Sequence, residues 1–327
     1  MAGAGQPWYM PALWPVGHVF EAATKKSKEE APTPVASPIL DLVGNFTSFA
    51  GALRGFLLAL VCIYVLPTDT YPAFGPAATW QWSWMQPIVV RNLCAAWTIC
   101  GFWDWFLYFS PLKAKLHKYK LNPLYPEWSQ FQHDAFWTTS ASLTAAAIEV
   151  AMCHLWATGR VEYQEDMWAT PVWNAAWILG ITHWRVPHFW LIHRAMHPWK
   201  TKSVPDLGKI LYKHVHSLHH RSYNPTAFSG TSMHPVESTL YYSAAFICVP
   251  FGCHPAIFLA CIIDCAVGAW LGHDGFQWPG SGDYFHQLHH AHFDCNYGAV
   301  HVPLDKWFGT FAGSKGAVAK IWGRSSK

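Results

Sequence analysis

The sequence predicts an all-α fold: an integral-membrane helical bundle of about four spans plus a hairpin, capped by a cytosolic His-rich helical domain that binds metal. Three features of the 327-residue chain support this prediction. Charged residues make up 13%, about half the usual share. Aromatic residues reach 17%, including 21 Trp, which suits the aromatic belts of membrane proteins. There are also 20 His, several of them clustered. A large soluble enzyme with a rich core is the alternative, and apolar stretches of near-spanning length argue against it.

Four apolar segments of near-spanning length precede the His clusters, at 46–66, 93–109, 135–157 and 171–192. Pro187 is expected to kink or end a turn of the last of these helices. Two shorter apolar segments, 236–249 and 256–271, flank a turn containing Pro and Gly, and predict a hairpin that enters the membrane and returns. The chain is accordingly divided into a flexible cytosolic tail (1–45), transmembrane helices (46–183), a His-rich domain (184–311) and a C-terminal tail (312–327).

The charged loops orient these spans. The loop between the second and third spans contains Lys113, Lys115, Lys118 and Lys120, and such basic loops face the cytosol. The next loop contains three acids and a single Arg, which suits the opposite side. Alternation then places the N-terminus and everything after the fourth span in the cytosol. All the His clusters are therefore expected on one face of the membrane.

Composition also argues against several functions. The net charge of +3 is small and no basic-aromatic patch stands out, so nucleic acid is not an expected partner. The nine Cys form no C-x-x-C pair, which argues against a zinc ribbon or a thioredoxin-like site. There is no G-x-G-x-x-G fingerprint for a dinucleotide, so any electrons must come from a separate donor, for which the Lys-rich loop is a candidate docking site.

One motif, H-x-x-H-H, occurs twice, although chance predicts roughly 0.07 copies. The first copy is His216, His219 and His220, and the second is His286, His289 and His290. A third cluster pairs His193 with His197. On a helix, residues three and four apart share one face, so imidazoles from one segment can converge. Neutral imidazole suits iron, zinc, copper and nickel, and eight of them are most simply explained by two adjacent ions.

Two further His are candidate ligands: His273, which precedes Asp274, and His234, which lies near Glu237. Three acids near the clusters are candidates to orient the imidazoles through hydrogen bonds: Glu237, Asp274 and Asp294. His214, His292 and His301 are either such orienting partners or surface residues, and His183 and His188 are expected to be structural.

These segments resemble the fatty acid hydroxylase / sterol desaturase superfamily, over about 184–311. The residues that carry the resemblance are HRAMH, YKHVHSLHHRSYNPTAFSGTSMHPVES, HDGF, YFHQLHHAHFDCNYG and PLDKWFGTF. The phrases HPVE, HFDCNYG and WFGTF are closest to the sterol-modifying branch of C-5 sterol desaturases and sterol hydroxylases. In this chain the family's His boxes match His193, His197, His216, His219, His220, His286, His289 and His290, with His273 as a lone family His.

The resemblance implies a non-haem di-iron centre that uses O2, with electrons from cytochrome b5 and a reductase, in the endoplasmic reticulum membrane. The expected function is desaturation of a sterol, with the lipid entering laterally from the bilayer. The alternatives are hydroxylation of a sterol, fatty acyl or sphingoid lipid, and oxidation of an isoprenoid precursor such as squalene. Three other classes compete: a zinc-dependent membrane hydrolase, a metal transporter and an inactive lipid-binding relative.

Overall fold

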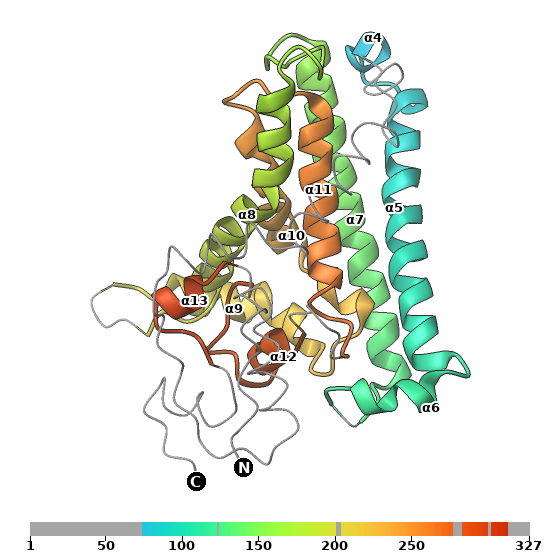
Figure 1. The fold of residues 1–327 in the computed structure, drawn as a ribbon, viewed down its shortest axis with the longest axis vertical. Coiled ribbons are helices and arrows are strands. Elements are labelled where there is room, and N and C mark those ends of the chain that lie inside the picture. Colours follow the sequence, from blue (N-terminus) through green and yellow to red (C-terminus); the bar gives the residue numbers. More distant parts are fainter. Residues whose placement is uncertain (1–73, 123, 201–203, 277–282, 300–301, 313–327) are drawn as a thin grey trace.

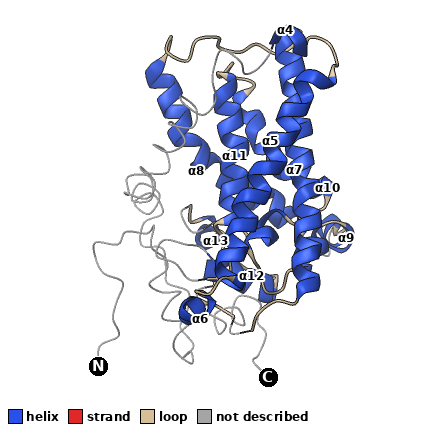
Figure 2. Cartoon of the chain, turned by 90° about the vertical axis from the view of Figure 1, so that its right-hand side faces the viewer, coloured by secondary structure: helices blue, strands red, loops and turns tan. Residues whose placement is uncertain are grey.

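The computed structural model describes residues 74–122, 124–200, 204–276, 283–299 and 302–312. Within these ranges the chain forms helices and no strands, apart from two isolated bridges, Lys120 with Phe276 and Ala299 with Val302. Figure 2 shows the same absence of strands among its coloured segments. The predicted all-α class is therefore confirmed for the described residues. The tail at 1–45 and the predicted span at 46–66 lie outside them.

The helices of the first half are α4 (Phe74–Ala77), α5 (Trp82–Asp104), α6 (Lys113–Leu116), α7 (Trp128–Ala157) and α8 (Pro171–Met196). A π-helical turn, η2 (Trp105–Phe109), extends α5, and a 3-10 turn, η3 (His117–Tyr119), follows α6. The second half contains α9 (Leu207–His214), η4 (His216–Arg221), η5 (Ala227–Thr231), α10 (Pro235–Tyr242), η6 (Ser243–Cys248), α11 (Pro255–Trp270), α12 (Asp283–His292) and α13 (Leu304–Trp307). The segments η4, η5 and η6 are 3-10 helices.

The long helices α5, α7 and α11 run side by side with the first part of α8 (Figure 1). Polar groups join α5 to α7, because Arg91 of α5 forms an ion pair with the fully buried Glu149 of α7. Another buried ion pair joins α8 to α11, where Arg185 Nε donates to Asp264 at 2.8 Å. The short elements η4, η5, α9, α12 and α13 gather at one end of this bundle (Figure 1).

The predicted spans match the helices only in part. The α5 helix begins at Trp82, well before the predicted start at 93. The α8 helix does not end at Pro187 but continues to Met196. Of the described helices, α7 is the one whose length and apolar composition would let it cross a membrane.

The residues of the predicted hairpin form α10 with η6, a turn at 249–254, and α11. Both of its α-helices begin in the same way. His234 and His254 each accept a hydrogen bond from the backbone N–H two residues later, and a Pro follows each His at the first helical position. Proline suits this position because an N–H group in the first turn of a helix has no partner within the helix, and proline has no N–H to leave unpaired. A His-Pro pair therefore starts each arm of the hairpin.

Candidate metal centre

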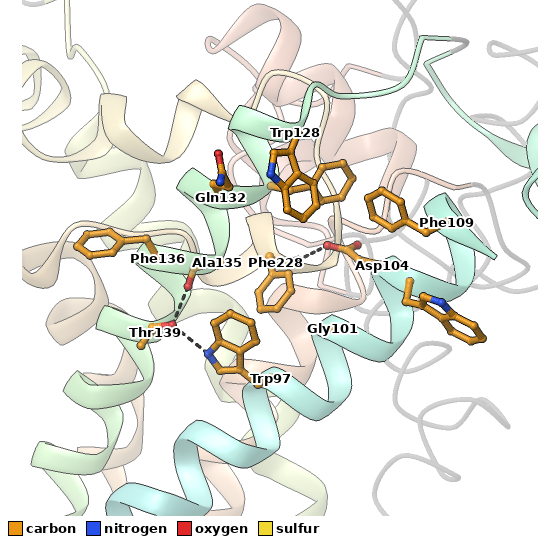
Figure 3. Close-up of a pocket in the computed structure, with 12 residues that line it drawn as sticks. Trp97, Gly101, Asp104, Phe109, Trp128, Gln132, Ala135, Phe136, Thr139 and Phe228 are labelled. Carbon is orange, nitrogen blue, oxygen red and sulfur yellow. Dashed lines mark hydrogen bonds between the residues drawn. The ribbon is translucent and has the colours of Figure 1, made fainter.

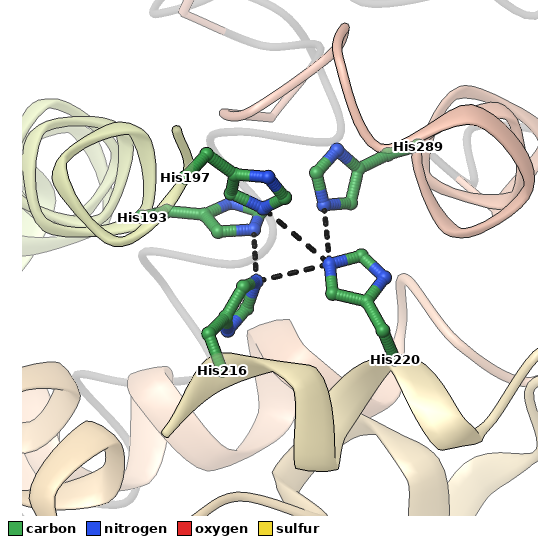
Figure 4. A group of neighbouring side chains, drawn as sticks. All are labelled: His193, His197, His216, His220 and His289. Atoms are coloured by element: carbon green, nitrogen blue, oxygen red, sulfur yellow. Dashed lines mark hydrogen bonds between the residues drawn. The ribbon is translucent and has the colours of Figure 1, made fainter. Parts of the chain in front are cut away.

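Nine His side chains from four parts of the chain converge at one end of the bundle. They form two groups, and the potential ligand atoms within each group lie within 4.8 Å of one another. Group 1 consists of His193, His197, His216, His220 and His289, and group 2 of His219, His273, His286 and His290. All nine are buried. Figure 4 shows group 1, with α8, η4 and α12 each directing imidazoles toward a common centre.

Each H-x-x-H-H motif supplies both groups. From the first motif, His216 and His220 enter group 1 while His219 enters group 2. From the second, His289 enters group 1 while His286 and His290 enter group 2. The two motifs therefore face each other, and each one bridges the two candidate metal positions. Because each motif supplies ligands to both groups, the two candidate metal positions lie next to each other.

Hydrogen bonds to Nδ1 set the orientation of most of these rings. Backbone carbonyls accept from the Nδ1 of four of them: Tyr297 from His193 at 2.6 Å, Ser232 from His219 at 3.3 Å, Ala269 from His273 at 2.7 Å and Cys295 from His289 at 2.7 Å. A carbonyl oxygen can only accept, so these Nδ1 atoms carry the proton and the Nε2 atoms carry an unshared electron pair. Partners of this kind are typical of metal-binding imidazoles.

Within each group, such Nε2 atoms point at each other. In group 2, the Nε2 atoms of His219 and His273 lie 3.3 Å apart, and both rings donate through Nδ1. In group 1, the Nε2 atoms of His193 and His216 lie 3.0 Å apart, and the Nδ1 of His216 faces the Glu237 carboxyl at 2.7 Å. Two facing electron pairs repel each other unless a cation lies between them. Each group therefore fits a metal ion of its own.

Burial keeps these rings neutral, which is the form that binds metal. Loss of solvation lowers the pKa of His216 to about 3. It also lowers the pKa of His219, and that of His273 falls well below its ordinary value. Protons therefore compete weakly for these sites near neutral pH.

His234, also a candidate ligand from the sequence, has a different environment from the nine grouped His. It lies outside both groups, and its Nδ1 accepts a hydrogen bond from the N–H of Val236 at 3.1 Å. Its ring stacks on Trp137. The His-Pro pair that starts α10 was the available sequence signal for this capping role, because the same pair starts α11.

The His that were not candidate ligands lie in different environments. His183 and His188 bond to Leu179 and Ser243, as expected of structural residues. His214 is exposed at the end of α9, and His301 lies outside the described residues.

Of the three acids expected to orient the imidazoles, Glu237 contacts a ring of the cluster, that of His216. Asp274 accepts instead from Trp103 Nε1 and from the N–H of Phe276, each at 2.8 Å. Asp294 pairs with Lys200 at 2.8 Å.

Asp305, a buried acid that no sequence motif singles out, holds the loop behind His193. Its carboxylate accepts from the N–H groups of Tyr297 at 2.9 Å and Gly298 at 2.8 Å, and from the Thr310 hydroxyl at 2.6 Å. The Tyr297 carbonyl in turn accepts from His193. Asp305 thus fixes the carbonyl that orients this ring. Asp305 lies in the sequence PLDKW, but its distance along the chain from the His motifs gives no sign that it acts on one of them.

An apolar pocket of about 680 Å³ lies between α5 and α7. Figure 3 shows Trp97 and Gly101 of α5 facing Ala135 and Phe136 of α7, with Phe228 of η5 between the two helices. The η5 segment is followed by Ser232, whose carbonyl orients His219. The segment from Phe228 to Ser232 therefore connects the lining of the pocket to the residue that orients His219.

Residues 177–310 match the family model described as fatty acid hydroxylase. Residues 177–310 of this chain are therefore similar to the fatty acid hydroxylase family. Lathosterol oxidase of Rattus norvegicus is 31% identical over 134 residues, which are 38% of this chain and 40% of that protein. A Delta(7)-sterol 5(6)-desaturase of Gibberella zeae is 28% identical over 132 residues, covering 38% and 33%. Methylsterol monooxygenase 1 of Gallus gallus is 26% identical over 133 residues, covering 38% and 41%.

The chain spans less than half the length of the curated relatives it matches. No solved structure matches it significantly. The names of these relatives describe the oxidation of sterols.

Proposed function

We propose that this protein is a membrane-bound oxidoreductase that uses two non-haem irons and O2 to oxidise a sterol, with C-5 desaturation as the first candidate reaction. The relatives named for sterol oxidation support the substrate class. The two groups of buried imidazoles support the pair of metal ions. Iron and copper are the imidazole-bound metals suited to O2 chemistry, and the match to the fatty acid hydroxylase family favours iron.

The observation that carries the proposal is the pair of Nε2 contacts between rings that donate through Nδ1. His219 faces His273 in group 2, and His193 faces His216 in group 1. Group 1 and group 2 would each hold one iron. When bound, the irons supply activation of O2 for removal of hydrogen from the lipid. The nine imidazoles would be the ligands.

The protein side chains would orient the ligands and exclude water. Glu237 and four backbone carbonyls keep the coordinating nitrogens directed inward. Burial of all nine rings limits solvent access. The pocket between α5 and α7, lined by Trp97, Phe136 and Phe228, would hold an apolar part of a lipid that enters from the bilayer.

The predicted topology completes this proposal. About four spans and a hairpin would place the metal centre on the cytosolic face, in the endoplasmic reticulum. Electrons would come from an external donor such as cytochrome b5 with its reductase. Lys115, which is exposed, is available to such an acidic partner, whereas Lys120 is buried and donates to Asn224 at 3.2 Å.

Hydroxylation of a sterol or another lipid is the second candidate, because methylsterol monooxygenase 1 of Gallus gallus aligns over the same share of the chain as the desaturase. Both reactions begin with removal of one hydrogen. They differ in whether a second hydrogen leaves or oxygen is added to the carbon.

The test is expression in a sterol-auxotrophic host, with mass spectrometry of total lipids and metal analysis of the purified protein. A new double bond supports desaturation, and a new hydroxyl supports the second candidate. His219→Ala should abolish the product while the protein level is retained. Purified active protein without iron, or unchanged turnover in this variant, would overturn the proposal.

A further inference from the structure

The segment 222–232 links the first H-x-x-H-H motif to the start of α10, and only η5 within it is helical. Two of its contacts reach His219 directly. The Ser222 N–H donates to the His219 carbonyl at 3.2 Å, and the Ser232 carbonyl accepts from His219 Nδ1 at 3.3 Å. The position of this segment therefore determines the position of a ring in group 2.

Asp134 of α7 holds this segment at two points. One carboxylate oxygen accepts from the Ser222 hydroxyl at 2.5 Å, and the other accepts from the Ser229 hydroxyl at 2.6 Å. Gln130 and His133, its neighbours on α7, contact the same carboxylate at 3.4 and 3.0 Å. Asp134 and both serines are fully buried. Hydrogen bonds to a buried carboxylate are among the stronger ones, because the donors compensate the charge.

Nearby contacts hold the same segment against the bundle. Thr138, one turn along α7 from Asp134, donates to the Phe228 carbonyl at 2.6 Å. Asp104 at the end of α5 accepts from the N–H of Ala227 at 2.7 Å. Asp104, Asp134 and Thr138 all precede the matched region 177–310. The helices ahead of the family domain thus take part in shaping its metal-binding cluster.

From these contacts we infer that Asp134 is a positioning residue for the metal centre: by clamping Ser222 and Ser229, it sets His219 in the geometry that binds metal. This inference rests on the proposed metal binding. It goes beyond that proposal because it assigns a role to a residue outside the His motifs and outside the family domain.

The contrast between Asp134→Ala and Glu149→Ala tests this role. Glu149 is a matched control, because it is also a fully buried carboxylate of α7, yet it binds Arg91 and Asn92 of α5. The full chain would be purified in detergent, stripped of metal and titrated with iron(II). The visible absorption of the cobalt(II)-loaded protein would report the ligand geometry.

Asp134→Ala should weaken iron(II) binding by about tenfold or more and change the cobalt(II) absorption. Glu149→Ala should lower the thermal unfolding midpoint but leave both metal readouts as in the wild type. Ser222→Ala keeps the Asp134 carboxylate, so it should change the iron(II) affinity and the cobalt(II) absorption in the same direction by a smaller amount. If Asp134→Ala does not fold, Ser222→Ala is the variant that tests the inference.

Unchanged metal readouts in Asp134→Ala or Ser222→Ala, or an equal change in Glu149→Ala, would overturn the inference. If the wild type itself binds no metal, the proposed function fails, and this inference fails with it. The wild-type titration therefore separates the two failures.

Discussion

His216 and Glu237 are joined by a hydrogen bond of 2.7 Å between Nδ1 and Oε1, and both residues are buried. His216 belongs to group 1, where its Nε2 lies 3.0 Å from that of His193 and 3.0 Å from that of His220. The Glu237 carboxyl therefore lies on the outer side of a ring whose inner nitrogen is central to the group. Burial raises the pKa of this carboxyl to about 8, and a metal ion bound in group 1 would favour its charged form, which fixes the ring and raises the basicity of the coordinating nitrogen.

Glu237→Gln should keep the shape of this contact and remove the charge. The expected result is a loss of iron(II) affinity of about 10-fold to 100-fold, because the ring becomes a weaker ligand. Iron content after equilibrium dialysis is the measurement. Glu162→Gln, at an exposed site far along the chain, is the control and should bind iron like the wild type. Equal affinity in the two variants would contradict a role for Glu237 at the metal.

His234→Ala and His273→Ala should separate a helix cap from a ligand. His234 caps α10 and lies outside both groups, so its loss should cost about 1 kcal/mol of stability and leave the iron content unchanged. His273 belongs to group 2, so its loss should deplete the metal held there and spare the metal in group 1. Metal analysis with thermal unfolding checks both. Loss of iron in His234→Ala would restore this residue to the ligand set.

The metal-free protein should lose stability as the pH falls from 7 to 5. Below about pH 6.5 the unfolded chain takes up a proton on each His, whereas burial lowers the pKa of folded His216 to about 3. The unfolded state then binds more protons, so the free energy of unfolding decreases with falling pH. For His216 alone the loss at pH 5 is about 2 kcal/mol.

The measurement is the thermal unfolding midpoint of the metal-free protein at both pH values, at one heating rate. His216→Gln cannot take up this proton, so its midpoint should fall less between pH 7 and pH 5. An equal fall in the variant and the wild type would assign the effect to other groups.

Much of the site could be predicted from the sequence, because ligand spacing is a local property. The repeated H-x-x-H-H motif and the pair His193 with His197 identified eight residues that the structure brings together, and His273 made a ninth. The division of each motif between two groups could not be predicted, since it depends on which ring faces which across the site. His234 was proposed as a ligand from its proximity to Glu237 along the chain, but it lies outside both groups and accepts from the backbone at the start of α10.

The partners of the imidazoles were harder to predict. Four of them are backbone carbonyls, such as those of Tyr297 and Cys295. Every residue has a backbone carbonyl, so the residue type does not indicate which one accepts a hydrogen bond. Asp134 lies 88 residues before Ser222, so only the packing of α7 against η5 brings them together. The helical class was predicted from the sequence, but the start of α5 was not, because its first turns contain polar residues and a Pro.

Gly101→Leu should test whether the pocket between α5 and α7 holds part of the substrate. A Cβ at Gly101 would meet the Phe228 ring at 3.8 Å, an ordinary contact, so a small side chain fits and a larger one must extend into the pocket. Leu at this position should lower product formation by about 10-fold, because it occupies space that an apolar ligand would fill. Iron content should stay as in the wild type.

Gly180→Leu in α8 is the matched control, since a Cβ there meets nothing within 4 Å and the residue does not line the pocket. Product per chain, measured by mass spectrometry alongside iron content, compares the two variants. If Gly101→Leu forms product at the wild-type rate, the lipid reaches the irons by another route. If it loses iron as well, the segment from Phe228 to Ser232 transmits the change to His219. The loss of turnover would then result from damage to the metal centre and not from blocked substrate binding.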